Sequence, residues 1–412
     1  MAITINTQPS SNELKSPYRP LQVKVSSNAG TIAKMKCFIH LDGGGTADNA
    51  SNPIILDPDF GTTDEFTFDI SGYLAGLDTL TATQQVKSDV VSLNDTSTNS
   101  LKSVYVKFTE LLDNGTTLSD GASSSNSNTF YVINGVWQYD EVSTEFTDFN
   151  LANTGSRYFL TNNRSTREIS LNDSYYLSFW TTRSTTDYFR VRRFTGKNGT
   201  GSNSDRYRPF SLTKNRWDVA CGPTNINSTF GGWFSDLGVT SASDPTLNDT
   251  YGSYEIQLFN NTSGAISEAV LFNLDHSGCE DNWTRIKFLN RLGAFEYFTF
   301  KGYRDKSVNI RKNYYNRVLS ESYSIGEGGD RTMYTDSRTQ FVVYSQQLKQ
   351  ADREWLIEML EGNECFVEEG SNYIPIKVRA GGTELINEGD GLMTIKMTYE
   401  YANPNRRQHG GY

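Results

Sequence analysis

The chain has 412 residues, which is more than one compact core of ordinary size, so its length favours roughly two to three domains. Hydrophobic residues make up 36% and aromatic residues 13%, a combination that excludes a disordered chain and favours strands joined by polar turns. The formal net charge of −10 disfavours a dedicated nucleic-acid binder, because phosphate neutralisation needs a surplus of Lys and Arg.

The first segment alternates apolar and polar residues as strands do. Leu21, Val23 and Val25 are separated by polar residues, and a second alternating run follows at 35–41. A period of two places the apolar residues on one buried face, so we predict an N-terminal β domain, a small β-sandwich, over residues 1–112. Residues 113–129 contain few apolar side chains and are expected to form a linker or a long exposed loop.

A second β domain is predicted over residues 130–278. Phe130–Ile133 is followed by Asn134-Gly135, a strong hairpin signal, and then by Val136–Tyr139. Further strands are expected at Tyr175–Trp180, Tyr188–Phe194 and Tyr254–Phe259. The segments between them, 196–205 and 223–232, look too polar to be buried.

The third predicted domain covers residues 279–412. The aromatic block up to Phe300 favours a strand over 295–300, and the alternation over 393–401 favours a closing strand. Apolar residues at three- and four-residue spacing predict an amphipathic helix over 346–361, with Ser345 as its cap and Gly362 at its end. The fold class is therefore mainly β, with two to three β-sandwich-like domains and one amphipathic helix near the C-terminus.

The cysteines, the histidines and the apolar segments indicate no metal site, no disulfide framework and no membrane span. Neither an apolar run of membrane-spanning length nor a signal-peptide pattern occurs, so we expect no membrane span and no export by the usual secretory route. The cysteines are scattered, and we expect them to be reduced and mostly buried: Cys37, Cys221, Cys279 and Cys365. His276 and Cys279 supply half a zinc site at most, while His40 and His409 stand alone.

Acidic residues gather in one turn, which holds Asp57, Asp59, Asp64 and Glu65. Such oxygen ligands suit a hard cation, but the spacing is not that of an EF-hand loop and a solvated turn is the favoured interpretation. No nucleophile elbow and no phosphate-binding glycine motif is present in the sequence. We therefore predict a non-enzymatic protein with no cofactor and with no catalytic, cofactor-binding or metal residues; its binding residues stay open.

Two basic stretches interrupt the acidic background. Arg190 and Arg192 alternate in the first, and the second contains Arg304, Lys306, Arg311 and Lys312. Arginine beside aromatic residues can bind nucleic acid or acidic glycans. We favour an assembly role, in which the exposed arginine face pairs with acidic residues of a neighbouring subunit. Aromatic residues in glycine-rich loops, Trp233 and Tyr251, suit either sugar stacking or subunit contacts.

Several segments resemble tail-associated structural proteins of tailed bacteriophages, of the kind found in marine and Bacteroidetes phages. The resemblance is carried mainly by 288–300, by 351–360 and by the closing strand, together with Ser16–Pro20 and Phe68–Ser71 near the start. It touches both ends of the chain and is looser in the middle, and its motifs concern packing. The resemblance implies a virion component of the tail or baseplate region.

We therefore expect a structural tail or baseplate ring or adaptor subunit that docks other tail proteins and other copies of itself. It would be made in the host bacterial cytoplasm and located in the virion tail. Two alternatives stay open. The first is a receptor- or glycan-binding protein that contacts the host surface through aromatic loops of residues 130–275. The second is a depolymerase of surface polysaccharide, which we expect to need an extended repetitive β scaffold.

Overall fold

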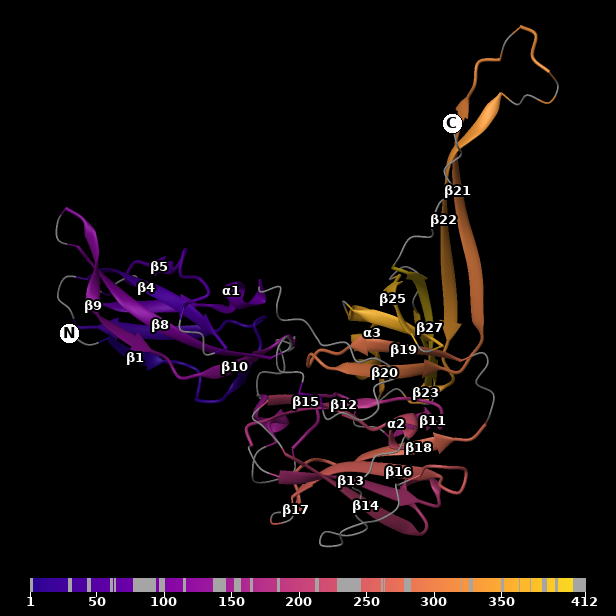
Figure 1. Ribbon diagram of the computed structural model, residues 1–412, viewed down its shortest axis with the longest axis horizontal. Helices are drawn as coiled ribbons and strands as arrows, with labels where there is room; N and C mark the ends of the chain where they lie inside the picture. Colours follow the sequence, from indigo (N-terminus) through magenta and orange to yellow (C-terminus); the bar gives the residue numbers. More distant parts are fainter. Residues whose placement is uncertain are drawn as a thin grey trace. The chain divides into compact units, whose positions relative to one another are not determined.

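The computed structural model describes most of residues 3–402 and divides them into two compact units. Outside the description lie 1–2, 29–31, 43–45, 60–61, 63, 77–93, 96–100, 114–115, 136–145, 152–156, 164–165, 184–185, 212–214, 228–245, 261, 263, 278–282, 320, 325, 327–328, 350–351, 363, 371, 380–383, 390–391 and 403–412. The first unit comprises 1–85, 89–276 and 290–295, and the second comprises 86–88, 277–289 and 296–412. The fold is mainly β, as predicted from the sequence (Figure 1).

Two sheets near the N-terminus form a β-sandwich. One has the strand order β1-β3-β6 and the other the order β2-β10-β8-β4-β5, with β9 also paired to β8. Their bounds are β1 Ile3–Thr7, β2 Leu14–Lys15, β3 Gln22–Ser27, β4 Ile32–Leu41, β5 Ile54–Leu56, β6 Glu65–Asp69, β8 Leu101–Asp113, β9 Leu118–Asn126 and β10 Phe130–Ile133. A short helix, α1, covers Ser71–Ala75.

The sandwich core follows from the predicted alternation. Val23 and Val25 of β3 are buried, while Gln22 and Lys24 between them are exposed. They pack in one cluster with side chains of β4, β6, β8 and β10, so both sheets contribute to a single core. This is the layer arrangement that one apolar face per sheet favours.

The prediction of a linker or loop over 113–129 is wrong for its central part. Leu118–Asn126 forms β9, which pairs antiparallel with β8. The strand contains mainly small polar residues and is largely exposed. Backbone pairing needs no apolar side chain, so hydrophobic alternation gave no signal for this strand.

The rest of the first unit contains two more sheets. Their strand orders are β11-β18-β16-β13-β14, with β17 on β16, and β12-β15-β7. The bounds are β7 Asn94–Asp95, β11 Arg167–Ser170, β12 Tyr176–Thr181, β13 Thr186–Phe194, β14 Asn203–Ser211, β15 Asn215–Ala220, β16 Ser253–Asn260, β17 Gly264–Ala265 and β18 Val270–Asp275. Short helical turns are η1 Phe146–Phe149, η2 Lys197–Gly199 and α2 Pro223–Asn227.

This region confirms the three predicted strands but corrects other expectations. No residue of the segment 196–205 is buried, as expected, although its last part belongs to β14, whereas Pro223 and Ile226 in the segment 223–232 are buried against expectation. β7 comes from the predicted N-terminal domain yet pairs with β15, so the predicted boundary at 112 does not separate the sheets. Val136–Tyr139, the second strand of the predicted hairpin, lies outside the described residues.

A second hydrophobic cluster in the first unit joins segments far apart in sequence. Its buried members are Leu14, Ile133, Phe149, Leu160, Trp180, Leu292 and Ala294. Asn290 fixes the last two, because its Oδ1 accepts from the backbone nitrogens of Leu292 and Ala294 at 3.0 and 2.8 Å. Residues 290–295 therefore belong to the first unit, although the sequence places them in the C-terminal domain.

The second unit is built on one nine-stranded sheet. Its order is β20-β19-β24-β25-β27-β22-β21, and β23 and β26 also pair with β27. The bounds are β19 Thr284–Leu289, β20 Phe295–Phe300, β21 Arg304–Asn316, β22 Asp330–Tyr344, β23 Leu348–Lys349, β24 Cys365–Glu369, β25 Asn372–Val378, β26 Glu384–Gly389 and β27 Leu392–Tyr401. The predicted strands at 295–300 and 393–401 are both present.

The helix of this unit, α3, begins at Arg353 and ends at Glu361, so the predicted start at 346 is wrong. Leu348 instead pairs with Met393 in β23, and the hydroxyl of Ser345 accepts from the backbone nitrogen of Ile395 at 2.9 Å. An apolar residue at the right spacing fits either a helix or a short strand, which explains the error. Gly362 follows the helix as predicted.

Burial of one face holds α3 against the sheet. Trp355, Leu356 and Met359 are buried in the same cluster as Ile395 and Met397 of β27. Burying a side chain of this size contributes about 1.5–3 kcal/mol. The amphipathic pattern thus predicted the packing face of the helix correctly although it misplaced the start.

Candidate functional site

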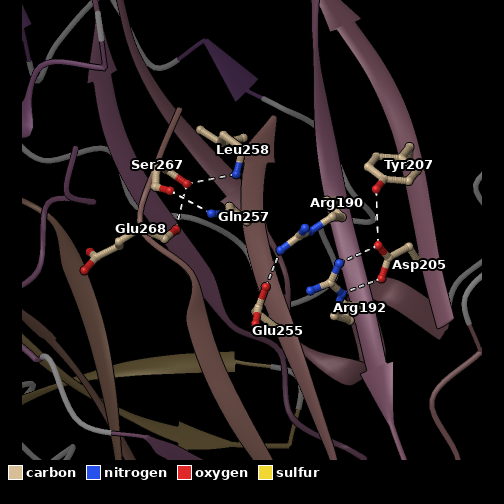
Figure 2. A network of polar contacts seen from close by, with 9 residues as sticks. All are labelled: Arg190, Arg192, Asp205, Tyr207, Glu255, Gln257, Leu258, Ser267 and Glu268. Atoms are coloured by element: carbon tan, nitrogen blue, oxygen red, sulfur yellow. Dashed lines mark hydrogen bonds and ion pairs between the residues drawn. The ribbon is translucent and has the colours of Figure 1, made fainter. Parts of the chain in front are cut away.

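The first basic stretch lies inside a polar network of the sheet β16-β13-β14, shown in Figure 2. Arg192 forms a bidentate pair with Asp205, with N···O distances of 2.6 and 2.8 Å. Arg190 donates to Glu255, and the hydroxyl of Tyr207 donates to Asp205 at 3.2 Å. The three strands are adjacent, so residues 13 to 65 positions apart meet on one sheet.

The charges of this network satisfy each other within the chain. The hydrogen bonds that Arg192 donates to the Asp205 carboxylate raise the pKa of Arg192. Burial would raise the pKa of Asp205, but the Arg192 guanidinium holds it below its usual range. Arg190 is only 7% exposed. The prediction that these arginines form an exposed face for a neighbouring subunit is therefore wrong, because sequence alone could not place Asp205 and Glu255 beside them.

The remaining sequence candidates are also explained by contacts within the chain. Arg193 stacks on the ring of Tyr251 at 4.7 Å, so this aromatic residue already has a partner. His276 Nε2 donates to the carbonyl oxygen of Tyr251 at 2.8 Å. His40 is buried and stacks on Tyr105. Cys279, Trp233 and His409 lie outside the described residues.

The acidic turn does not gather its carboxylates around one point. Asp59 accepts hydrogen bonds from the backbone nitrogen and the hydroxyl of Thr67, at 3.1 and 2.6 Å, and Asp57 pairs with Lys34 at 3.2 Å. Within the described residues, no group of three or more His, Cys, Asp or Glu side chains is placed to hold a metal ion. Over the same residues, no helix has the length and apolar character needed to cross a membrane.

The second basic stretch lies on a β-hairpin that projects from the sheet of the second unit (Figure 1). β21 and β22 pair along Arg304–Asn316, but β22 pairs with β27 only through Gln340–Tyr344. We call the part beyond that pairing, 308–316 and 330–339, the arm. Among the described strands, the two strands of the arm pair with each other alone, and they continue past the ends of the other strands (Figure 1).

The arm exposes large apolar side chains. The exposed fractions are 52% for Val308, 58% for Ile310, 63% for Tyr314 and 55% for Met333. An isolated two-stranded hairpin is marginally stable in water, and clustered exposed apolar side chains are typical of interaction surfaces. The arm therefore joins a two-stranded extension with exposed apolar side chains.

Strand register shows why Val308 and Ile310 are exposed. Phe341 and Val343 lie directly opposite Lys306 and Arg304, and both are buried in the core of the unit. Because side chains alternate, Val308 and Ile310 continue this core-facing side of the sheet beyond the region that the core covers. The other side of the arm is polar, with Asn309 opposite Arg338 and Arg311 opposite Asp336.

The base of the arm is fixed by Arg304. Its guanidinium lies 4.0 Å from the ring centroid of Phe341 and donates to Glu369 at 2.7 Å. The hydroxyl of Tyr401 also donates to Glu369, at 2.5 Å. These contacts tie β21 to side chains of β22, β24 and β27 close to the point where the arm begins.

The pKa values of Glu369 and Arg304, where the arm begins, are those of an ion pair. Burial would raise the pKa of Glu369, but hydrogen bonds from Tyr401 and Arg304 lower it overall. Burial would lower the pKa of Arg304, and its hydrogen bond to Glu369 raises it instead. Both groups are therefore charged at neutral pH.

Sequence reasoning found the basic residues of the arm but missed its exposed apolar face. The local signal was present, since Val308 and Ile310 alternate with polar residues. Alternation indicates one apolar side of a strand, but the sequence does not show whether another layer covers that side.

No protein-family model matches the chain, and no curated protein matches it.

Proposed function

We propose that the chain is a non-enzymatic structural subunit of a bacteriophage virion, in a tail or baseplate ring or adaptor. The observation that carries the proposal is the arm, a two-stranded extension whose exposed Val308 and Ile310 suit contact with a neighbouring subunit. The sequence resemblance to tail-associated proteins supports the same assignment. Partners would be other copies of the chain and other tail proteins.

The polar networks of the sheets support a structural role over a binding cleft. Arg190 and Arg192 form ion pairs with carboxylates of the same sheet, and Arg193 stacks on the ring of Tyr251. These side chains stabilise the framework and leave the arm as the surface that suits docking. We therefore favour the structural role over the host-binding alternative.

Two measurements test the proposal. Mass spectrometry of purified particles is expected to find the chain in the virion, at a copy number that fits a ring or adaptor. Electron microscopy of particles produced without the chain is expected to show tails that lack a part or fail to assemble. Intact, infectious tails in its absence would overturn the proposal.

A further inference from the structure

The outer edge of β21 offers backbone hydrogen-bonding groups to a further strand. β21 pairs with β22 on one side, and it is the last strand in the order of its sheet. No strand of the described chain pairs with its other side. An uncovered edge of this kind is a template for strand addition, and main-chain hydrogen bonds then supply affinity.

The charge of this edge is opposite to that of the whole chain. β21 contains four basic residues and one acidic residue, whereas the chain has a net charge of −10. Lys306, Arg311 and Lys312 are all exposed. Direct pairing of two β21 strands would bring like charges together, so the complementary partner is an acidic strand edge.

The chain itself contains such an edge in β26. This strand pairs with β27 alone among the described strands. Its sequence, Glu384–Gly389, includes two glutamates and no basic residue. Glu384 forms a long ion pair with Lys396 of β27, at 3.9 Å, and its side chain is still 60% exposed; Ile386 is 41% exposed. β26 therefore combines an edge that no described strand covers with acidic and apolar residues, the complement of β21.

From these two edges we infer that β21 of one copy adds to β26 of a second copy and continues the sheet from subunit to subunit. The inference deepens the proposed structural role and rests on it for its place in the particle. The contact joins two different surfaces of the same chain. Such head-to-tail contacts close into rings or extend into filaments. The exposed Val308 and Ile310 lie next to the new strand pair and are covered there.

A charge-swap experiment on the full-length purified chain tests the inference, with molar mass measured by light scattering. One variant carries Lys306→Glu and Lys312→Glu on β21, and another carries Glu384→Lys and Glu388→Lys on β26. We expect the wild type to form oligomers and each variant to be reduced to monomer, because each has like charges on both edges. The variant with all four substitutions is expected to regain the wild-type mass.

The pattern of rescue separates this contact from other modes of association. Mixing the two double variants is also expected to restore oligomers, since each supplies the edge that the other has lost. Symmetric pairing of two β21 edges would give no recovery in the fourfold variant, and that result would overturn the inference. Circular dichroism confirms that each variant is folded.

The outcome is independent of the assignment to a virion. A monomeric wild-type chain would overturn the strand-addition contact, while its detection in purified particles would still support the structural role. Oligomers that follow the charge-swap pattern, together with absence from the particle, would support the contact and overturn the assignment.

Discussion

Arg304 combines stacking on Phe341 with an ion pair to Glu369, so one side chain joins β21, β22 and β24. We expect Arg304→Ala to lower the free energy of unfolding by about 1–3 kcal/mol, because Glu369 loses a charged partner in a half-buried site. Urea unfolding measures the change. Arg311→Ala is the matched control on the same strand, with an expected change within about 0.5 kcal/mol.

Equal decreases in the free energy of unfolding for Arg304→Ala and Arg311→Ala would contradict the role given to Arg304. Arg311 is exposed and lies in the arm, so its truncation leaves the buried part of the sheet unchanged. The comparison therefore separates the base of the arm from its exposed part.

The lowered pKa of Glu369 predicts a dependence of stability on pH. In the folded chain its pKa is lower than in the unfolded chain, so its contribution is complete above the unfolded value of about 4.3. That contribution is lost as the pH falls through the lower, folded value. We expect Glu369→Gln to be less stable than wild type at pH 7 and the difference to shrink below about pH 4. A difference that grows on acidification would contradict this sign.

Burial predicts that three of the cysteine thiols are inert in the folded chain. Burial raises the pKa of Cys365 to about 12 and raises the pKa values of Cys37 and Cys221 further. We expect a maleimide to leave these three unmodified until the chain unfolds, as measured by peptide mapping with mass spectrometry. Rapid labelling of any of them under native conditions would contradict the packing described here.

At the scale of elements, the sequence predicted strands where one face is buried and failed where the partner is distant. The alternation at Val23 and in β27 predicted both the strand and its buried face. β9 was not predicted, because its residues are small and polar. The predicted helix began too early, because Leu348 fits a strand as well as a helix. The pairing of Arg192 with Asp205 depends on strand order, which composition and periodicity do not contain.

The arm allows a prediction at the scale of an element. Its Val308 and Ile310 lie on the core-facing side of the sheet, but beyond the part of the sheet that the core covers. We expect Val308→Ser and Ile310→Ser to change the free energy of unfolding of the monomer by no more than about 0.5 kcal/mol while weakening self-association. Val343→Ala on the same face of the buried part is the control. It is expected to cost about 2 kcal/mol, because it removes buried methyl groups. Thermal and urea unfolding of the three variants measure the contrast.

At the scale of the whole molecule, the chain combines a well-packed sheet framework with one extended, exposed strand pair. Its cores are covered, its middle-region arginines are paired within the chain, and its large exposed apolar residues are concentrated in and around the arm. This distribution favours a subunit that completes its surface by assembly. The mainly β fold could be predicted from composition and alternation, whereas the arm required the register of β21 with β22.

An electron-microscopy map of the assembled particle would show both the location of the chain and the neighbours of its arm. We expect the chain to lie in the tail or baseplate region and a neighbouring subunit to cover the Val308 and Ile310 face of the arm. A map in which the chain is absent from the particle, or in which this face of the arm is bare to solvent, would contradict this expectation.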